Sequence, residues 1–354
     1  MKSYVLTAFG SPLQTIEAPV PVPQGTEVLL KTLATGVCHS DLHIWDGYFD
    51  LGDGKRQLVA NSGIVPPITM GHEIAGEVAG IGPEAKGVKP GERYVAYPWI
   101  GCGECPACRA GRENICTAGE RTLGIRRPGG YAEYVLVPHP RYLAPLGKLS
   151  PAQAAPYACS GLTSYAALKR VGEAVYRTQP ILILGAGGLG LTCLKLLKAL
   201  GGKGAVVSDI DAKKREAALA AGALAAIDPQ TEKPARALNA AAKAPIAAAI
   251  DFVGAESTAR LGMAAIARGG KYVIVGLFGG EITLALPLIS LRALAIEGLV
   301  TGTLAEFKEL MALVAQGKIE GVPLDERPLA EANQALMDLR AGRIVGRAVL
   351  KPSA

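Results

Sequence analysis

The sequence predicts a two-domain α/β protein, in which a mostly-β N-terminal domain is followed by a doubly wound parallel sheet. At 354 residues the chain is long enough for two cores of ordinary size. Residues 1–155 contain short β-like runs separated by glycine and proline, which is typical of a barrel or sandwich. After about residue 156, wholly apolar strands alternate with helical patterns, as expected for a parallel sheet covered on both faces.

Composition narrows the class of protein further. Apolar residues make up 49% of the chain and charged residues 19%, as in ordinary soluble enzymes. The net charge of +6 comes from scattered lysine and arginine, which argues against a nucleic-acid or lipid partner. The N-terminus lacks the apolar region of a signal peptide, and Lys195 and Lys198 interrupt the most apolar stretch, Ile181–Leu200. We therefore expect a cytoplasmic protein whose seven cysteines serve metal binding or catalysis rather than disulfides.

The expected elements follow from these patterns. In the N-terminal domain, strands are expected at Glu27–Thr32, Glu73–Ile81, Arg93–Tyr97 and Ala132–Val137. In the second domain, residues 156–302, the expected strands are Ile181–Leu184, Ala205–Ser208, Ala225–Asp228, Ala247–Val253 and Lys271–Gly276. The helical patterns between them are Leu189–Leu200, Lys213–Ala221 and Ser257–Ala267. A C-terminal segment, residues 303–354, contains the helical pattern Leu304–Gln316 and the strand Arg347–Leu350, and is expected to return to the first domain.

Four cysteines lie close together in a glycine-rich loop at residues 98–118. They are Cys102, Cys105, Cys108 and Cys116. Two-residue spacers let neighbouring thiolates surround one ion, and four sulfurs fill a tetrahedral shell with no place for a substrate. The spacing therefore predicts a structural zinc. An iron–sulfur cluster is the competing interpretation, because thiolates also bind iron, and four loop cysteines without a metal are less expected in a reducing compartment.

A glycine-rich turn joins the first apolar strand of the second domain to a helix. Gly185, Gly187 and Gly190 form the pattern G-x-G-x-x-G, which in this strand–turn–helix context is typical of dinucleotide binding. The glycines allow a pyrophosphate to approach the helix N-terminus, whose N–H groups favour an anion. Asp209 ends the next strand, where an acid binds the adenosine ribose hydroxyls and repels a 2′-phosphate, so NAD is expected rather than NADP. The alternative is that Asp209 only caps the next helix, although Asp211 is better placed for that role.

Three further candidate ligands, Cys38, His72 and Cys159, are far apart in the sequence. One histidine and two thiolates with an open fourth position form a known catalytic zinc shell. Sequence spacing alone does not join these three residues. A lone cysteine is more often a small buried hydrophobe, and a lone histidine is more often a satisfied core residue.

Taken together, the motifs resemble those of zinc-containing medium-chain alcohol dehydrogenases. The runs GVCHSDLH (Gly36–His43) and GHE (Gly71–Glu73), the cysteine lobe and the glycine turn occur in that family's order over essentially the whole chain. The insertion Asp46–Pro67 and the run YPWIGCGEC are most similar to bacterial and archaeal tetrameric members. The resemblance implies a GroES-like catalytic domain, a Rossmann domain and a homotetramer.

The resemblance also implies roles for individual residues. Cys38, His72 and Cys159 would bind the catalytic zinc, Glu73 would lie behind it and ligate it transiently, and Asp41 would fix the tautomer of the metal-bound histidine. Ser40 and His43 would pass the alcohol proton through the cofactor ribose to solvent; a turn-forming role is the alternative for Ser40. The cofactor-binding residues would be His39, Thr163, Gly185, Gly187, Gly188, Leu189, Gly190, Asp209, Lys214, Val253 and Arg347.

The substrate cleft is expected to be apolar. Trp45 and Trp99 would line it, and Thr122 stands where an archaeal relative places a second tryptophan, which would open the cleft to larger alcohols. Of the remaining candidates, Cys193 is expected to fill the core and His139 to be a structural loop residue.

These inferences predict reversible oxidation of primary or simple secondary alcohols, including aromatic ones, with NAD and two zinc ions per subunit. A polyol or sugar-alcohol dehydrogenase on the same scaffold is the first alternative. A zinc-free quinone reductase would lack Cys38, His72 and the lobe, and a non-catalytic NAD-binding redox sensor would not need an intact metal shell and relay. The apolar segment Ala295–Thr301 is expected to be the strand that continues the sheet across a dimer axis.

Overall fold

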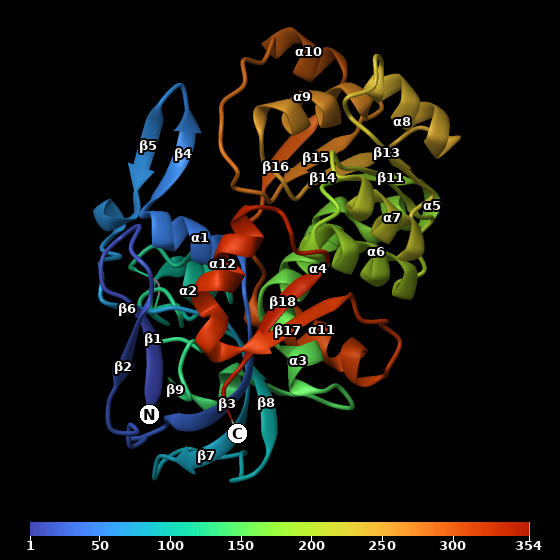
Figure 1. Cartoon of the computed structure of the whole chain (residues 1–354). Coiled ribbons are helices and arrows are strands. Elements are labelled where there is room, and N and C mark those ends of the chain that lie inside the picture. The colour runs from blue at the N-terminus through green and yellow to red at the C-terminus, as the bar shows by residue number, and fades with distance from the viewer. Residues whose placement is uncertain (120, 354) are drawn as a thin grey trace.

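The structure, a computed structural model, describes residues 1–119 and 121–353 and has two lobes (Figure 1). The first lobe combines strands from the beginning of the chain with its last strands, blue and red in Figure 1. The second lobe holds a parallel sheet with helices around it. Among the helices of the described ranges, none is long and apolar enough to cross a membrane.

The first lobe is built around a seven-stranded sheet in the order β10-β8-β7-β3-β18-β17, with β9 paired to β3 beside this path. Its strands are β3 (Val28–Gly36), β7 (Glu73–Ile81), β8 (Arg93–Ala96), β9 (Tyr134–Val137), β10 (Leu143–Pro145), β17 (Leu324–Pro328) and β18 (Arg347–Lys351). A second sheet contains β1 (Lys2–Leu6), β2 (Gln14–Glu17) and β6 (Ile68–Thr69), and a hairpin contains β4 (Tyr48–Gly52) and β5 (Lys55–Leu58). The strand expected at residues 73–81 is confirmed with its bounds, and the other three expected runs each overlap a strand.

The second lobe contains a six-stranded parallel sheet in the order β13-β12-β11-β14-β15-β16. Its strands are β11 (Ile181–Leu184), β12 (Ala205–Ser208), β13 (Ala225–Ile227), β14 (Ala248–Asp251), β15 (Lys271–Ile274) and β16 (Ala295–Gly298). All four residues of β11 are buried, which explains why the strand is wholly apolar rather than alternating. The strand order reverses between β11 and β14, and ligands of such sheets bind beyond the carboxyl ends of the strands at this point. The predicted doubly wound sheet is confirmed.

Twelve helices connect and cover these sheets in the part of the chain that is described. They are α1 (His39–Asp46), α2 (Pro106–Arg109), α3 (Pro151–Ala154), α4 (Ser160–Val171), α5 (Glu173–Thr178), α6 (Gly188–Ala199), α7 (Ala212–Ala220), α8 (Pro234–Ala242), α9 (Glu256–Ala265), α10 (Leu286–Leu291), α11 (Leu304–Ala315) and α12 (Ala332–Arg340). The helical patterns predicted at residues 189–200, 213–221, 257–267 and 304–316 correspond to α6, α7, α9 and α11 within one or two residues at each end. Alanine-rich α8 has no predicted counterpart, although Leu238 and Ala242 of its buried face lie at helical spacing.

The last part of the chain crosses back to the first lobe. Strand β18 pairs antiparallel with β3 through Val349 opposite Gly36, and parallel with β17. One large buried cluster contains residues of both sheets, for example Val95 of β8 and Val207 of β12. The two lobes therefore meet through a packed boundary, beside which the candidate site lies.

Candidate active site

The carboxyl end of β3 and the start of β7 bring two of the expected ligands together. Gly36 is opposite Glu73 in the antiparallel register, so Cys38, which follows β3, lies near His72, which precedes β7. Cys38 is also the N-cap residue of α1. Cys159 reaches the same place from the start of α4. Three segments that are far apart in the sequence thus converge at one point.

Cys38, His72, Glu73 and Cys159 form a cluster of four buried groups. Their ligand atoms all lie within 4.8 Å of one another, and the two sulfurs are 4.0 Å apart. The Nε2 atom of His72 is buried without a hydrogen-bond partner among the described residues. An unpaired buried nitrogen costs about 1–3 kcal/mol, and a metal ion in this cluster would be its partner. The combination of two thiols, an imidazole and a carboxylate fits zinc.

Hydrogen bonding favours the thiolate form of one cysteine. The pKa of Cys38 lies well below its usual value, chiefly because of its hydrogen bond with the Cys159 thiol, and His72 lowers this pKa further. Metals bind the thiolate rather than the thiol. The environment of Cys38 therefore suits a metal ligand better than a core filler.

Asp41 holds His72 from behind. Its buried carboxylate accepts a hydrogen bond from Nδ1 of His72 at 3.1 Å. The second oxygen accepts hydrogen bonds from the backbone N–H of Cys38 at 2.9 Å and from the hydroxyl of Tyr131 at 3.1 Å. With its proton on Nδ1, His72 directs the lone pair of Nε2 into the cluster, as a metal ligand requires. Sequence reasoning missed Tyr131, which belongs to no recognised motif.

We expect Asp41→Asn to weaken zinc binding at this cluster by about 10–100-fold, the usual cost of removing the partner of a metal-bound histidine. The amide lacks the negative charge that holds the proton on Nδ1. Competition with a chelator, followed by zinc release, measures the change. Tyr131→Phe is the matched control, because it removes one donor to the same carboxylate but leaves the His72 contact. Zinc release that is equal in wild type and Asp41→Asn would contradict the role of Asp41.

Glu73 borders the cluster and is paired with Arg347. Both side chains are buried, and Nη2 of Arg347 lies 2.5 Å from a carboxylate oxygen of Glu73. The other oxygen accepts a hydrogen bond from the backbone N–H of Ser160 at 3.2 Å. Burial raises the pKa of Glu73 to about 7, against the lowering effect of Arg347. Gly36 leaves room for this carboxylate, because a Cβ at that position would lie 1.8 Å from it.

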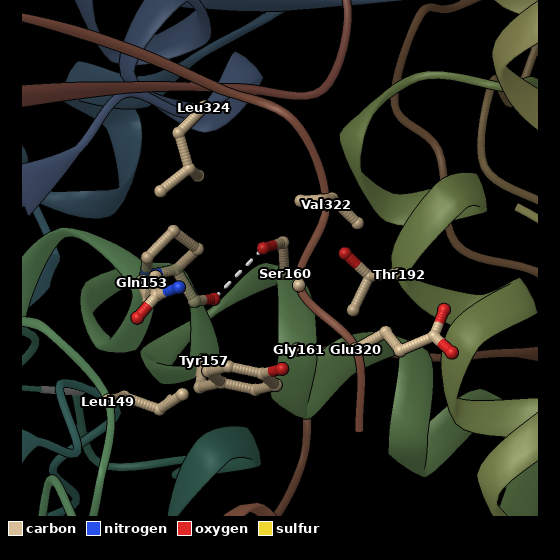
Figure 2. Close-up of a pocket in the computed structure, with 11 residues that line it drawn as sticks. Leu149, Gln153, Tyr157, Ser160, Gly161, Thr192, Glu320, Val322 and Leu324 are labelled. Carbon is tan, nitrogen blue, oxygen red and sulfur yellow. Dashed lines mark hydrogen bonds between the residues drawn. The ribbon is translucent and has the colours of Figure 1, made fainter. Parts of the chain in front are cut away.

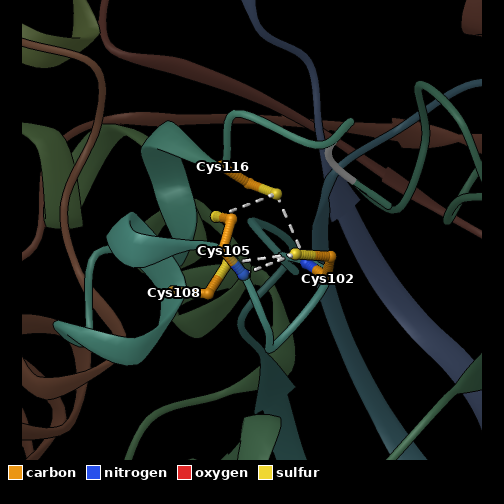
Figure 3. Close-up of side chains that lie close together, drawn as sticks. All are labelled: Cys102, Cys105, Cys108 and Cys116. Atoms are coloured by element: carbon orange, nitrogen blue, oxygen red, sulfur yellow. Dashed lines mark hydrogen bonds between the residues drawn. The ribbon is translucent and has the colours of Figure 1, made fainter.

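The four cysteines of the lobe turn their sulfurs toward one another, as Figure 3 shows. Sγ of Cys102 lies 3.9 Å from Sγ of Cys108, and Sγ of Cys105 lies 3.9 Å from Sγ of Cys116. Zinc–sulfur bonds of about 2.3 Å place tetrahedral sulfurs about 3.8 Å apart. The lobe therefore fits one zinc ion better than an iron–sulfur cluster, which would place several iron atoms between the thiolates.

We expect Cys105→Ser to lose one zinc per subunit and to lower the melting temperature by about 4–8 °C. This range follows from a loss of about 2 kcal/mol of folding free energy, because each kcal/mol shifts the melting temperature by about 2–4 °C. A structural zinc contributes directly to folding free energy. Elemental analysis and calorimetry measure the two effects. Glu104→Gln, an exposed change in the same loop, is the control and should keep both zinc ions. Iron in the preparation would contradict the zinc assignment.

The glycine turn between β11 and α6 has the shape that a dinucleotide requires. Gly185 has a φ of +92°, in the left-handed region that favours glycine. A Cβ on Gly190 would lie 2.0 Å from the carbonyl oxygen of Gly185, and one on Gly188 would lie 2.2 Å from Cδ of Arg347. A Cβ on Gly187 would meet no described atom within 4 Å beyond its chain neighbours, so the turn is open there. This open side lies at the N-terminus of α6, where helix N–H groups favour a pyrophosphate.

Two expected cofactor residues lie against this turn. The side chain of Arg347 lies against it at Gly188. Val253 follows β14, and its Cγ2 would lie 2.8 Å from a Cβ on Gly185. Leu189 accepts a hydrogen bond at its carbonyl oxygen from the hydroxyl of Ser164 at 3.0 Å, which ties the turn to α4.

Asp209 follows β12 and lies beside the same turn. Its carboxylate accepts hydrogen bonds from the backbone N–H groups of Ala186 at 2.7 Å and Asp211 at 2.8 Å. The cap of α7 is Asp211, which accepts a hydrogen bond from the backbone N–H of Lys214 at 3.2 Å. The interpretation of Asp209 as the helix cap is therefore wrong. Its half-exposed carboxylate remains at the carboxyl end of the sheet, and Lys214 lies half-exposed on α7.

The expected relay residues lie on α1, next to Cys38. Ser40 and His43 are three residues apart, so they share a face of the helix, and both are half-buried, whereas His39 is exposed. Burial lowers the pKa of His43, which favours a neutral imidazole that is able to accept a proton. Thr163, one turn into α4, is buried, and its hydroxyl has no hydrogen-bond partner within residues 1–119 and 121–353. A ligand beside it would supply that partner.

The two tryptophans have different surroundings. Trp99 packs on His72 with ring centroids 5.3 Å apart, and its Nε1 donates a hydrogen bond to the carbonyl oxygen of Ala158 at 3.3 Å. Trp45 lies in a separate core cluster against α12, where its indole N–H donates to a carbonyl oxygen of the N-terminal segment. The structure corrects the expectation that Trp45 lines the cleft, because α1 turns this side chain into the core. Phe49 was missed; its half-exposed ring lies 5.1 Å from that of His43.

Thr122, Cys193 and His139 lie outside the cluster. Thr122 is buried, with a 2% exposed surface. Cys193 is fully buried in the large core cluster, as predicted for a core residue. His139 accepts a hydrogen bond from the backbone N–H of Arg141 at 3.0 Å and caps a short helical turn, so it is structural, as predicted.

A small cavity of about 20 Å³ lies beside Ser160, the residue after Cys159 (Figure 2). Figure 2 shows Thr192 of α6 and Glu320 on one side of it, and Gln153 on the other. Its volume is enough for a water molecule and too small for an alcohol beside a dinucleotide. It is a packing gap rather than the substrate site.

A buried cysteine–histidine cluster beside a dinucleotide-type turn defines a metal-dependent dehydrogenase. Residues 24–148 match the family model of the alcohol dehydrogenase GroES-like domain, and residues 188–316 match that of zinc-binding dehydrogenases. An NAD-dependent alcohol dehydrogenase of Sulfurisphaera tokodaii is 38% identical over 99% of this chain and 100% of its own length. The chain belongs to the zinc-dependent medium-chain alcohol dehydrogenase family.

A sugar dehydrogenase and a solved alcohol dehydrogenase structure are also similar to this chain. A D-arabinose 1-dehydrogenase (NADP(+)) of Saccharolobus solfataricus is 33% identical over 99% of this chain and 97% of its own. The crystal structure of an alcohol dehydrogenase from Aeropyrum pernix has a TM-score of 0.89 and 28% identity, covering 99% of this chain and 100% of that one. Similarity over nearly the full length of each protein thus extends to both alcohol and sugar dehydrogenases.

Proposed function

We propose that this protein oxidises alcohols with NAD, using one catalytic and one structural zinc per subunit. The observation that carries the proposal is the buried cluster of Cys38, His72 and Cys159, in which the unpartnered Nε2 of His72 faces two sulfurs. A zinc ion held there would supply the Lewis acidity that lowers the pKa of a bound hydroxyl. Relatives named as NAD-dependent alcohol dehydrogenases support the same activity.

The chain's own residues then have defined tasks. Asp41 holds His72 in its ligating tautomer, and Glu73 lies beside the cluster, paired with Arg347. The Ser40 hydroxyl is able to accept the alcohol proton and to donate one onward, and neutral His43 is suited to receive it at the outer end. We propose that His39 and Arg347 bind the pyrophosphate at the open glycine turn.

Further residues position the rest of the dinucleotide. We propose that Thr163 and Val253 hold the nicotinamide ring, and that Asp209 and Lys214 bind the adenosine ribose. Trp99 packs on the imidazole of His72, with ring centroids 5.3 Å apart.

The preferred substrates are primary or simple secondary alcohols with an apolar group. Trp99 packs on His72, and Phe49 packs on His43. These two aromatic rings favour apolar substrates. NADH formation with ethanol, hexanol and benzyl alcohol, compared with sorbitol and D-arabinose, tests this choice. We expect kcat/KM for hexanol and benzyl alcohol to exceed that for the sugars by at least about tenfold, since apolar contacts of one methylene alone give about 10–200-fold.

The sugar relative makes sugar oxidation the second candidate function. A higher kcat/KM for D-arabinose or sorbitol than for hexanol would favour it over alcohol oxidation. NADH formation with none of these compounds would instead favour a redox sensor without catalytic function.

We further propose a homotetramer built from dimers, in which β16 of two subunits pairs across a dimer axis. This strand is at the end of its sheet and is largely exposed. The neighbouring α10 exposes Leu286, Leu288 and Leu291, and an open apolar edge of this kind favours pairing with a second copy. Light scattering at micromolar concentration should give the tetramer mass; a monomer would contradict the assembly.

The free thiols of both clusters fit a reducing compartment, so we propose that the protein is cytoplasmic.

A further inference from the structure

Arg215 lies directly behind the residue that is proposed to bind the adenosine ribose. It belongs to α7, and its Nη1 donates hydrogen bonds to the carbonyl oxygens of Asp209 and Ile210, each at 2.9 Å. Its Nη2 lies 3.0 Å from a carboxylate oxygen of Asp228. The side chain of Arg215 is 20% exposed and that of Asp228 is 37% exposed, so solvent screens the pair only in part.

Asp228 reaches Arg215 from the next strand of the sheet. It follows β13, and the backbone N–H of Asp209 donates to the carbonyl oxygen of Ile227 at 3.3 Å, so the ends of β12 and β13 are adjacent. One oxygen of Asp228 accepts a hydrogen bond from the backbone N–H of Gln230 at 2.9 Å, which fixes the carboxylate. The guanidinium is therefore held between two strand ends, with its charge opposed by Asp228.

We propose that Asp228 is a specificity-determining residue for the cofactor, because it keeps Arg215 turned to the backbone and neutralises its charge. The inference rests on the proposed function, since it requires the adenosine ribose to bind at Asp209. A 2′-phosphate on that ribose would approach the Asp209–Ile210 segment, and Arg215 is the cation already bonded to this segment. Arginine binds phosphate with strong, paired hydrogen bonds. As long as Asp228 holds Arg215, the 2′-phosphate of NADP is repelled by the carboxylate of Asp209, and no cation compensates for this repulsion.

Neighbouring cations offer an alternative partner for the phosphate. Lys213 is exposed and Lys214 half-exposed on the same helix. Neither ammonium group makes a hydrogen bond or ion pair within the described part of the chain, so both are already available in the native protein. Asp228 controls only Arg215. The test therefore has to separate an effect that needs Arg215 from one that the lysines supply.

Cofactor kinetics of the zinc-loaded enzyme, started from Asp209→Gly, provide this separation. Adding Asp228→Asn should raise kcat/KM for NADP by about 10–100-fold over Asp209→Gly alone, the gain expected from one charge-assisted hydrogen bond. Adding Arg215→Gln to this pair should abolish the gain, whereas Arg215→Lys should keep part of it, because lysine binds phosphate as a point charge. The dissociation constant of NADPH, from fluorescence titration, should follow the same order, while zinc content and melting temperature report on the fold.

Glu216→Gln is the matched control. It lies next to Arg215, is exposed, and makes no hydrogen bond or ion pair with any described residue, so it removes one negative charge without releasing Arg215. In the Asp209→Gly background it should change kcat/KM for NADP by less than about twofold, as screened surface charges contribute little. A gain equal to that of Asp228→Asn, or a gain that survives Arg215→Gln, would overturn the inference. If Asp209→Gly kept the native preference for NAD over NADP, the assignment of Asp209 itself would be overturned instead.

Discussion

Cys38→Ser is expected to lower kcat/KM for alcohol oxidation by at least about a thousandfold, because metal assistance is worth several kcal/mol and each 1.4 kcal/mol is tenfold. A serine hydroxyl is not ionised at neutral pH and does not replace a thiolate as a zinc ligand. The side chain is buried within the cluster, so the remaining Cys159 and His72 would hold zinc weakly. Steady-state NADH formation and elemental analysis measure activity and metal on the same preparation.

The zinc count makes this result specific to the cluster. Cys38→Ser should retain one zinc per subunit, in the lobe of Cys102, Cys105, Cys108 and Cys116. Cys193→Ala is the control, because Cys193 is a buried cysteine outside both clusters. It should keep both zinc ions and most of the activity. Full activity of Cys38→Ser, or loss of both ions from it, would contradict the assignment of separate catalytic and structural sites.

The native enzyme is expected to prefer NAD over NADP by at least about two orders of magnitude in kcat/KM. Asp209→Gly is expected to reduce this preference sharply. A 2′-phosphate brings about two negative charges toward the carboxylate, and like charges at such contacts cost several kcal/mol. The substitution also removes acceptors for the ribose hydroxyls, so kcat/KM for NAD should fall while that for NADP rises. The carboxylate is fixed by Ala186 and Asp211, which holds it at the edge of the glycine turn.

Kinetics with both cofactors test this expectation, and zinc content should not change because the metal clusters contain no residue of this strand. Asp211→Ser is the control: serine still caps α7 while a nearby negative charge is lost. Its cofactor preference should stay close to that of the native enzyme. Comparable use of NAD and NADP by the native enzyme would show that Asp209 does not discriminate between them.

The sequence predicted best where one kind of local physics determines the structure. Strands β11 and β12 have their expected bounds. All four residues of each strand are buried, and the two runs are almost wholly apolar. The glycine turn was equally predictable, because positions such as Gly185 and Gly190 tolerate no side chain. Local chemistry of this kind is visible in one short stretch of sequence.

Long-range geometry was predictable only through the family resemblance, or not at all. Trp45 resembles a cleft residue in sequence, but the return of α12 covers it, and nothing near residue 45 indicates that packing. Tyr131 donates to Asp41 across 90 residues of sequence, and Asp228 reaches Arg215 from a neighbouring strand. Such contacts depend on strand order and register, which a single sequence does not display.

Zinc titration of the chelator-treated enzyme tests the central claim most directly. A chelator that removes the catalytic zinc should leave about one zinc per subunit in the cysteine lobe, since four thiolates there hold zinc more firmly than the open shell. On adding zinc back, NADH formation from hexanol and NAD should rise in proportion to the metal bound, from near zero at one zinc to full activity at two per subunit. Full activity at one zinc per subunit, or activity that follows iron instead, would contradict a zinc-dependent alcohol dehydrogenase with separate catalytic and structural sites.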